Sequence, residues 1–361
     1  MRIVTVFGTR PEAIKMAPII RAARAANIEM HVCVTAQHRD MLDQMLRVFD
    51  IAPDHDLNLM QENQTPLEFA ARVFETLPRV LRKIRPDWLL VQGDTTTAFA
   101  AAFVAFQEKI LIGHVEAGLR TGDKHRPFPE EMNRHLISPL ADLNFVPTAR
   151  AAANLRAEGI PAARIVLTGN TVVDALSFIL SSPVNFADAR LAQLSGRILL
   201  VTAHRRENFG APLEQICSAI LALTEKFTDL TAVLPVHPNP SVRSAITAQL
   251  ANRQRILLAD PLAYPEFIHL LKRASLILSD SGGVQEESPS VRVPVLVLRE
   301  VTERPEAIES GWAQLVGTAK EEIVQAASAW LSGQKIAPSR SAPNPFGDGH
   351  AAEKILAALA E

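Results

Sequence analysis

Residues 276–287 read LILSDSGGVQEE and join a short apolar strand to a glycine turn and the start of a helix. Glycines after a strand let backbone N–H groups approach a ligand closely, and a helix N-terminus favours an anion. The turn at Ser281, Gly282 and Gly283 is therefore either a phosphate-binding turn or a plain strand-to-helix connection. Strand, turn and helix in this order are the unit from which α/β folds are built.

Apolar runs of strand length recur along the chain and alternate with amphipathic helical segments such as Leu67–Ile84. The predicted strands are Ile3–Phe7, Met30–Thr35, Trp88–Gln92, Ile110–Val115, Leu143–Val146, Ile165–Leu167, Ile198–Thr202, Ala232–Val236, Ile256–Leu258, Leu276–Ser279, Val293–Leu298 and Gln314–Val316. Strands that are apolar throughout and separated by helices are typical of parallel sheets covered on both faces. These twelve strands exceed what one doubly wound sheet usually holds. We therefore predict two Rossmann-like α/β domains with doubly wound parallel sheets, facing a central cleft.

The alternation pauses between Gly169 and Gly196, where SSPVNFADAR at residues 181–190 has a linker-like composition. We place the domain boundary near Gly169. The prediction is an N-terminal domain over residues 1–168 and a C-terminal domain over residues 169–350. Residues 351–361 are predicted to form a last helix that packs back on one of the domains, with the N-terminal domain as the candidate.

The composition is that of a globular enzyme, with 361 residues, 48% of them hydrophobic, and a formal net charge of −2. This charge argues against a nucleic-acid partner. Cys33 and Cys217 have no partner motif, so we interpret both as buried hydrophobic residues in a reducing compartment. The N-terminus has no signal-peptide pattern, and the longest apolar stretch is too short to cross a bilayer. We expect a cytoplasmic protein without a membrane partner.

In open parallel sheets, ligands bind outside the carboxyl ends of the strands. Polar or glycine-rich segments follow eight of the predicted strands, in both halves of the chain. Arg10, Lys15, Arg205 and Arg304 stand beside such strand ends and are candidates to neutralise a pyrophosphate, although each alone is also typical of a solvated surface charge. Glu287 lies six residues beyond Ser281, within reach of a ribose hydroxyl pair.

Carboxylates gather in the first half of the chain. Asp94 and Glu116 follow strands, and Glu130 opens a helix after a proline-rich turn. Such carboxylates either pair with Arg120 or Arg134 or supply general acid and base groups. The chain lacks G-x-G-x-x-G after its first strand, lacks a Walker A sequence, and shows no metal-ligand spacing. We therefore expect no nicotinamide, flavin or ATP, no metal, and no other cofactor.

Together the motifs resemble the non-hydrolysing UDP-N-acetylglucosamine 2-epimerase family. The segments that carry the resemblance are GTRPEAIKMAP (8–18), TAQHRDMLDQ (35–44), VQGDTTTA (91–98), GHVEAGLRTGD (113–123), RPFPEEMNR (126–134), TAHRREN (202–208), PVHPNP (235–240), DPLAYPEF (260–267), SDSGGVQEESPS (279–290), VLVLREVTERPE (295–306), LVGT (315–318) and NPFGDGHA (344–351). They run nearly end to end and in the family's order.

The resemblance implies a GT-B type fold, a homodimer, a UDP-sugar substrate and a role in polysaccharide biosynthesis. It implies reversible C2 epimerisation of UDP-N-acetylglucosamine to UDP-N-acetylmannosamine, through elimination of UDP and a 2-acetamidoglucal intermediate. By this likeness Asp94, Glu116, Glu130 and His204 are the catalytic candidates. The same likeness assigns UDP binding to Arg10, Lys15, Arg205, Phe267, Ser281, Gly282, Gly283, Glu287 and Arg304, with Phe267 flanking the uracil.

Two departures from the family pattern are present. Some bacterial relatives bind a second UDP-sugar as an activator, and Gln37, Gln64 and His237 match that candidate effector site. Asp40 and Asn63 replace a glutamine and an arginine of that site. The second departure is Trp312, which stands where relatives often have a small polar residue, and which either packs in the core or reshapes the site for another sugar.

Other functions stay open at this point. A glycosyltransferase of the same fold would need an acceptor and a single base, and three carboxylates argue against it. A hydrolysing relative would release free UDP, and a silent UDP-sugar sensor would be expected to lack one of the catalytic candidates. An epimerase of a related UDP-acetamido sugar would bind UDP through the same residues.

Overall fold

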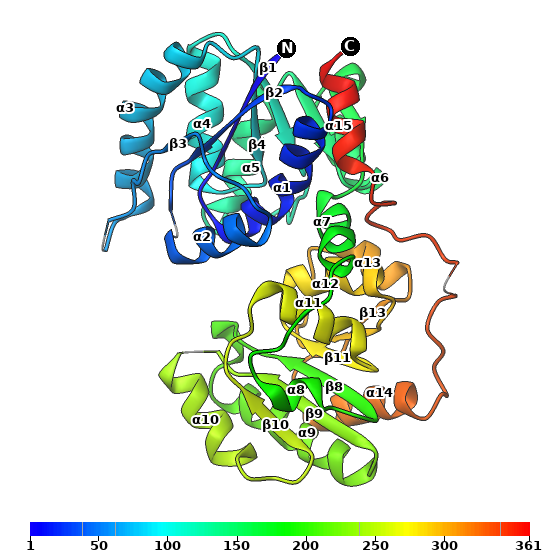
Figure 1. Ribbon diagram of the computed structural model, residues 1–361. Helices are drawn as coiled ribbons and strands as arrows, with labels where there is room; N and C mark the ends of the chain where they lie inside the picture. The colour runs from blue at the N-terminus through cyan, green and yellow to red at the C-terminus, as the bar shows by residue number, and fades with distance from the viewer. Residues whose placement is uncertain (38, 62, 238, 340) are drawn as a thin grey trace. The chain divides into compact units, whose positions relative to one another are not determined.

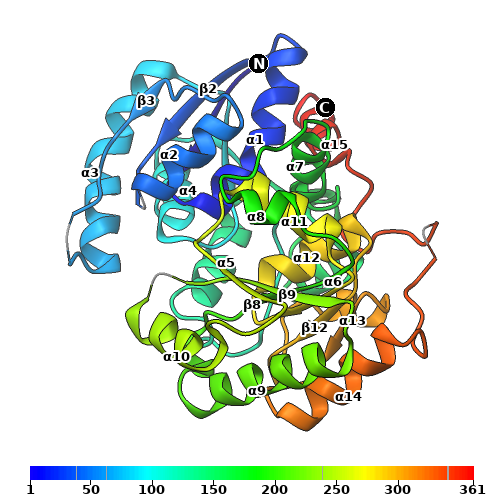
Figure 2. The same cartoon turned by 60° about the horizontal axis from the view of Figure 1, so that its bottom comes forward.

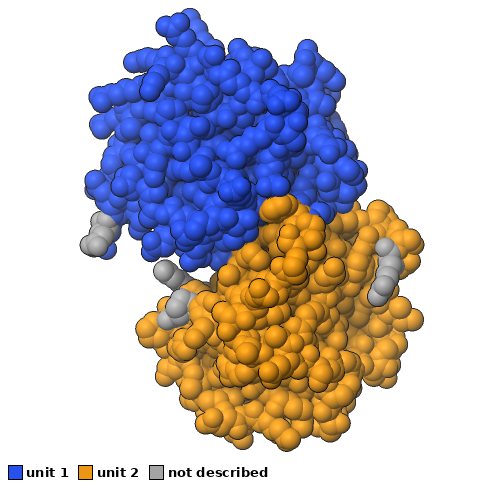
Figure 3. Space-filling model, in the orientation of Figure 1, with its two compact units in different colours: residues 1–177, 346–361 blue, residues 178–345 orange. Residues whose placement is uncertain are grey.

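The computed structural model describes residues 1–37, 39–61, 63–237, 239–339 and 341–361. These form two compact units, coloured separately in Figure 3: Met1–Ser177 with Phe346–Glu361, and Phe178–Pro345. The sequence pattern places the boundary at residue 168, whereas the contacts extend the first unit through Ser177. One reason is that Asp174 accepts a hydrogen bond of 2.9 Å from the backbone N–H of Ala352.

The first unit is built on a seven-stranded sheet with the order β3-β2-β1-β4-β5-β6-β7, in which every pair is parallel. Its strands are β1 (Arg2–Phe7), β2 (Glu29–Val34), β3 (His55–Asp56), β4 (Trp88–Gln92), β5 (Leu111–Val115), β6 (Leu143–Val146) and β7 (Ile165–Leu167). The predicted strands of this half are all present, and β3 is an additional short edge strand. The strand order reverses between β1 and β4, so their carboxyl ends form the switch point at which such sheets bind ligands.

Helices cover the sheet of the first unit (Figure 1). They are α1 (Arg10–Ala25), α2 (Arg39–Val48), α3 (Pro66–Ile84), α4 (Thr96–Gln107), α5 (Glu130–Leu140), α6 (Ala149–Ala157), the 3-10 turn η1 (Ala162–Arg164) and α15 (Ala351–Leu359). The helix α7 (Thr171–Leu180) begins in the first unit and ends in the second. Small residues let α4 approach the sheet closely, since Ala98, Ala100, Ala101, Ala102 and Ala105 are all buried. They pack in one core with Val4 and Val6 of β1 and Leu89 of β4.

The last helix returns to the first unit, where α15 packs against α1 (Figure 1). Its apolar face is buried through Ile355, Leu356 and Leu359. Asn170 fixes the approach of this segment, because its backbone N–H donates a hydrogen bond of 2.7 Å to the carbonyl of Phe346.

The second unit is built on a six-stranded parallel sheet with the order β10-β9-β8-β11-β12-β13. Its strands are β8 (Arg197–Thr202), β9 (Leu230–Pro235), β10 (Ile256–Ala259), β11 (Leu276–Ser279), β12 (Val295–Val297) and β13 (Ala313–Leu315). All six were expected from the apolar runs. This order reverses between β8 and β11, which places a second switch point at their carboxyl ends.

The helices of the second unit repeat the doubly wound pattern, as Figure 2 also shows. They are α8 (Ala189–Ala192), the 3-10 turn η2 (Arg206–Asn208), α9 (Ala211–Lys226), α10 (Pro240–Leu250), α11 (Tyr264–Arg273), α12 (Gly282–Val291), α13 (Pro305–Glu309) and α14 (Lys320–Leu331). In the core, Leu199 and Val201 of β8 pack with Ile220 of α9 and Ile323 of α14. Among the described residues, no helix has both the length and the apolar composition that a membrane span requires.

Candidate active site

The switch point of the first sheet begins with the turn after β1. Thr9 caps α1, and Glu12, at the third helical position, is buried in that turn. Glu12 Oε2 accepts hydrogen bonds from the backbone N–H groups of Gly8 (3.0 Å) and Thr9 (2.8 Å). Its Oε1 accepts a third bond, of 2.7 Å, from the hydroxyl of Thr95. Glu12 therefore ties the turn after β1 to the turn after β4.

Burial gives Glu12 an unusual acidity. Loss of hydration raises its pKa to about 7, although the hydrogen bonds from Thr95, Gly8 and Thr9 act in the opposite direction. The packing around this turn is close, because a Cβ atom at Gly8 would overlap the hydroxyl of Thr35. Only glycine fits at that point.

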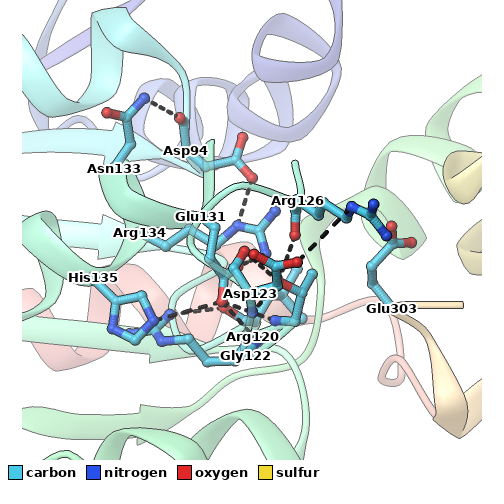
Figure 4. Close-up of polar contacts among 12 residues, drawn as sticks. Asp94, Arg120, Gly122, Asp123, Arg126, Glu131, Asn133, Arg134, His135 and Glu303 are labelled. Carbon is cyan, nitrogen blue, oxygen red and sulfur yellow. Dashed lines mark hydrogen bonds and ion pairs between the residues drawn. The ribbon is translucent and has the colours of Figure 1, made fainter. Parts of the chain in front are cut away.

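Asp94 lies in the turn after β4 and is held by a buried cation (Figure 4). Arg134 Nε donates a hydrogen bond of 2.8 Å to Asp94 Oδ2, and Asn133 Nδ2 donates one of 2.8 Å to the Asp94 carbonyl. Both donors come from α5. The side chain of Asp94 keeps a relative exposure of 30%, so its carboxylate is oriented and still open to a ligand.

Arg134 is itself fixed by a buried acid. Its Nη1 lies 2.9 Å from Oε2 of Glu131, and Glu131 Oε1 accepts hydrogen bonds from the backbone N–H groups of Thr121 (2.9 Å) and Gly122 (3.1 Å) (Figure 4). Asp94, Arg134 and Glu131 thus form a chain from the strand end into the protein. Asp94 thus makes the expected pairing with Arg134, but its partly exposed carboxylate stays available for acid/base chemistry as well.

Glu116 follows β5, the neighbour of β4 in the sheet. It is buried and adopts a left-handed backbone conformation with φ of 61°, which is uncommon for a residue other than glycine and costs of order 1–3 kcal/mol. Its carboxylate pairs with Lys15 Nζ and accepts hydrogen bonds from Gln92 Nε2 and Asn170 Nδ2. Such backbone strain is concentrated at functional positions in proteins.

Glu130 opens α5 and is partly buried. Its Oε2 makes no hydrogen bond with any residue that the structure describes, although the atom is shielded from solvent. Arg10 is the first residue of α1 and is also partly buried. Asn133 of the same helix donates to the carbonyl of Asp94. A Cβ atom at Gly93, the residue before Asp94, would lie 4.0 Å from Glu116 Oε2. The fold therefore brings Asp94, Glu116 and the first turn of α5 together.

The switch point of the second sheet is organised by Asp280, which directly follows β11 and is fully buried. Its Oδ2 accepts hydrogen bonds of 2.9 Å from the backbone N–H groups of His204 and Arg205 and from Asn208 Nδ2. One carboxylate oxygen therefore anchors the turn after β8, which carries both predicted site residues His204 and Arg205.

The glycine turn after β11 has the form expected of an anion site. Ser281 caps α12, and Gly282 and Gly283 form the first turn of this ten-residue helix. A Cβ at Gly282 would lie 3.5 Å from the guanidinium of Arg304, which is held by Glu286 at 2.8 Å. A cation and a helix N-terminus at one point make a favourable place for a phosphate.

The predicted ribose and uracil residues lie on adjacent helices of the second unit. Glu287 of α12 is buried, and its Oε1 accepts a hydrogen bond of 2.8 Å from the hydroxyl of Tyr264, the first residue of α11. Phe267 lies three residues further along α11 and is partly buried. Tyr264 thus connects the two predicted positions.

The candidate effector residues are distributed over both units. Gln37 accepts a hydrogen bond of 3.0 Å from the Thr97 hydroxyl, and Gln64 accepts bonds from the backbone N–H of Gln61 and from Arg72. His237, at the end of β9 in the second unit, is exposed and accepts a bond of 3.2 Å from the Asn239 N–H.

Trp312 is the largest fully buried side chain of the described residues. The guanidinium of Arg292 lies 5.6 Å from its ring centroid. Trp312 is therefore a packing residue of the second unit, which was one of its two interpretations.

The sequence patterns assigned no site role to Glu12, Asp280 or Glu131, and they named Arg134 only as a possible pairing partner of the carboxylates. Glu12 stands three residues after the capping threonine of a strand-end turn, and Asp280 stands between a strand and its glycine turn. These two positions, next to strand ends, could have identified Glu12 and Asp280 as site residues from the sequence. Glu131 and Arg134 carry no such signal, because their partners Thr121 and Asp94 come from other turns.

Two doubly wound parallel sheets, one with carboxylates and the other with a glycine turn and a helix N-terminus at the strand-order reversal, define an enzyme of the GT-B type. A glycosyltransferase of kitacinnamycin, 13% identical, matches this fold with a TM-score of 0.61 over 99% of this chain and 93% of its own. The family model for UDP-N-acetylglucosamine 2-epimerase matches residues 21–360, and the chain belongs to this family of isomerases.

Individual relatives agree with the family assignment. The UDP-N-acetylglucosamine 2-epimerase of Yersinia pestis is 48% identical over 369 residues, which cover 99% of this chain and 98% of that protein. The crystal structure of UDP-GlcNAc 2-epimerase from Neisseria meningitidis bound to UDP-GlcNAc is 43% identical, with a TM-score of 0.90 and full coverage of both chains. The family and fold class predicted from the motifs and strand pattern are thus confirmed.

Proposed function

We propose that this protein catalyses the reversible epimerisation of UDP-N-acetylglucosamine at C2 to give UDP-N-acetylmannosamine. One observation supports this most directly: three carboxylates, Asp94, Glu116 and Glu130, lie at one strand-end edge of the first sheet, and the second sheet carries an anion-binding turn at its own switch point. Family membership and the UDP-GlcNAc bound to the Neisseria meningitidis relative point to the same substrate.

The chemistry requires a leaving group, because the hydrogen on C2 has no adjacent carbonyl to make it acidic. A base removes the C2 proton while the C1–O bond breaks, and the bonding electrons pass to the oxygen of the β-phosphate. UDP and 2-acetamidoglucal then form without any net oxidation. Re-addition of UDP to C1, with protonation of C2 on the opposite face, completes the epimerisation.

Two faces of C2 require two proton-transfer groups. Asp94 and Glu116 follow neighbouring strands, and Glu130 opens the helix that holds Asp94. We assign proton transfer to these three carboxyl groups. Arg134 orients Asp94, and the Lys15 pair orients Glu116, which is the kind of fixed geometry that efficient proton transfer needs.

The second unit supplies most of the residues that we assign to UDP, and Arg10 and Lys15 come from α1 of the first unit. We assign the diphosphate to the turn at Ser281, Gly282 and Gly283 with Arg304, and the ribose to Glu287. Phe267 flanks the uracil, and His204, Arg205, Arg10 and Lys15 add positive charge or donors for the departing diphosphate. Fixed donors around a leaving anion lower the barrier because its charge is largest when the bond breaks.

A homodimer is part of the proposal. On α4, Phe103 and Phe106 expose 39% and 54% of their surface, and on the neighbouring α5, Met132 and Leu136 expose 38% and 44%. Exposed apolar side chains on two packed helices are candidates for an interaction surface. We also propose a cytoplasmic protein that serves polysaccharide biosynthesis, in keeping with a UDP-sugar substrate and two unpaired, buried cysteines.

The function is tested by proton NMR of UDP-N-acetylglucosamine with the protein in D2O. We expect UDP-N-acetylmannosamine to appear and solvent deuterium to enter C2 of both sugars, with no acceptor added. Free UDP accumulating in step with the free sugar would indicate a hydrolysing enzyme instead. Turnover only after an acceptor is added would indicate a glycosyltransferase. Turnover of another UDP-acetamido sugar, with none of UDP-N-acetylglucosamine, would show that this related sugar is the substrate.

The carboxylate assignment is tested by Asp94→Asn, Glu116→Gln and Glu130→Gln. Each change removes one proton-transfer group with little change of shape, so we expect kcat to fall by roughly 100- to 10,000-fold. Glu108→Gln is the matched control, since Glu108 is a carboxylate of the same unit that pairs with Arg82 away from these strand ends. Full activity in all three variants would contradict the assignment.

A further inference from the structure

The two oxygens of Asp280 are used differently. Oδ2 anchors the turn after β8 through three donors, as described above. Oδ1 is buried and makes no hydrogen bond with any described residue, but it lies 3.3 Å from Nδ1 of His204. A buried acceptor without a donor is unfavourable, and a protonated Nδ1 is a donor within reach.

The surroundings of His204 favour one ring orientation. Its ring stacks on that of His237, with centroids 6.0 Å apart and planes inclined by 13°. Arg205 and Glu207 follow it on the same turn, and Asp280 faces it from the end of β11. The pKa of His204 is lowered because partial burial disfavours its charged form, and the charges of His237 and Arg205 act in the same direction. The charge of Asp280 acts in the opposite direction but does not reverse the shift.

We propose that Asp280 is the positioning residue for His204: its carboxylate holds the ring by Nδ1–H and leaves Nε2 for the diphosphate of the bound UDP-sugar. This inference rests on the proposed function, in which His204 contacts the departing UDP. The same aspartate fixes the backbone of the turn through Oδ2, so a single side chain sets both the position of His204 and the face that its ring presents.

The consequence for the reaction is electrostatic. When the C1–O bond breaks, the electron pair and the negative charge move onto the β-phosphate oxygen. The bound diphosphate adds its negative charge to that of Asp280, so the His204 ring takes up a proton from solvent and, as an imidazolium, donates its Nε2–H to that oxygen as the charge develops. No covalent bond to His204 forms, and the hydrogen bond weakens again when UDP returns to C1.

The first test uses the unmodified protein. We would label the ten histidines with 15N and identify His204 by the signal lost in His204→Gln. We expect the neutral form of His204 to carry its proton on Nδ1, which the 15N shifts of the two ring nitrogens report directly. A neutral form protonated on Nε2 would overturn the proposal.

The second test replaces the charge and keeps the shape. In Asp280→Asn the amide oxygen can still accept from the turn, while the amide N–H2 faces Nδ1 and forces it to become an acceptor. We expect the His204 tautomer to change to Nε2–H and its midpoint of titration to fall by roughly 1 to 3 pH units. We expect kcat to fall by about the same factor as the imidazolium population above the midpoint, roughly 10- to 1,000-fold, because the charged form that donates to the diphosphate becomes rarer.

Asn208→Ala is the matched control, because it removes one donor to Oδ2 and leaves the Asp280 charge in place. Its His204 titration should match that of the unmodified protein. An equal fall in both variants would show that loosening of the turn, and not the charge, sets the His204 titration, and would overturn the proposal.

These spectra need no turnover. If the 15N spectra are as expected but no deuterium enters C2 of the UDP-sugar, the proposed function is refuted and the role of Asp280 is not. If the unmodified protein exchanges the C2 hydrogen but Asp280→Asn leaves the His204 15N spectrum unchanged, the role of Asp280 is refuted and the proposed function is not.

Discussion

The buried carboxyl of Glu12 should make the stability of the first unit depend on pH, and Glu12→Gln should remove that dependence. The pKa of Glu12 rises from 4.5 to about 7 in the folded protein because burial disfavours its charged form. Since the folded value lies above the unfolded one, the fold favours the protonated form. The resulting stabilisation is complete below about pH 4.5 and is lost as the pH rises through 7.

The size of the effect follows from the pKa difference. Each pH unit corresponds to about 1.4 kcal/mol, so a rise from 4.5 to about 7 corresponds to about 3 kcal/mol of unfolding free energy. A glutamine at this position can accept from the N–H groups of Gly8 and Thr9 and donate to the Thr95 hydroxyl. The substitution therefore keeps the hydrogen bonds and removes the ionisation.

The assay is urea unfolding between about pH 4 and pH 8, followed by the fluorescence of Trp88 in the first unit. Both proteins would carry Trp312→Phe and Trp330→Phe, which leaves Trp88 as the single tryptophan. We expect the unfolding free energy of the parent, relative to Glu12→Gln, to decline by about 3 kcal/mol across this range.

Glu68 provides a matched control. It also stands at the third position of a helix behind a capping threonine, Thr65, but it is exposed, and hydrogen bonds from Thr65 lower its pKa. Glu68→Gln should therefore give a pH trend of the opposite sign. A difference between parent and Glu12→Gln that stays constant with pH would refute the reasoning about Glu12.

Three further outcomes follow from the site and the core. Arg134→Gln should lower kcat roughly 100-fold while UDP affinity, measured by calorimetry, stays the same, because Asp94 loses its orienting donor; an equal loss of UDP affinity would contradict this. Arg304→Gln should weaken UDP binding by about 1.5–3 kcal/mol, or roughly 10- to 150-fold; unchanged calorimetric affinity would remove Arg304 from the phosphate site. Trp312→Ala should cost the second unit about 3–5 kcal/mol in urea unfolding, and the half-buried Trp330→Ala should cost less; equal costs would contradict the packing role.

Most of the fold follows from patterns that the chain carries locally. A central parallel strand is buried on both faces, so it must be apolar throughout, and such runs are visible in the sequence. The strand β3 lacks this signal because it is an edge strand of two polar residues, His55 and Asp56. Its pairing with Cys33 and Val34 of β2 depends on the sheet already being formed.

The positions of Asp94, Glu116 and His204 were predictable, because each lies within two residues of a strand end. The supporting contacts were not, because they join distant parts of the chain. Arg134 meets Asp94 across 40 residues, and Asp280 meets the N–H of His204 across 76. Local periodicity carries no information on such pairs, which are decided by the order of strands in the sheet.

The return of α15 to the first unit has a consequence for how the chain matures during synthesis. A ribosome releases residues 1–177 long before it makes Phe346–Glu361, yet these last residues belong to the same unit, and Leu359 lies beside β5 near Gly113. Residues 178–345, by contrast, are contiguous and emerge as a complete set. The unit that begins first must therefore wait for residues 346–361 before its packing can close, so its core is completed only after the whole of the second unit has been synthesised.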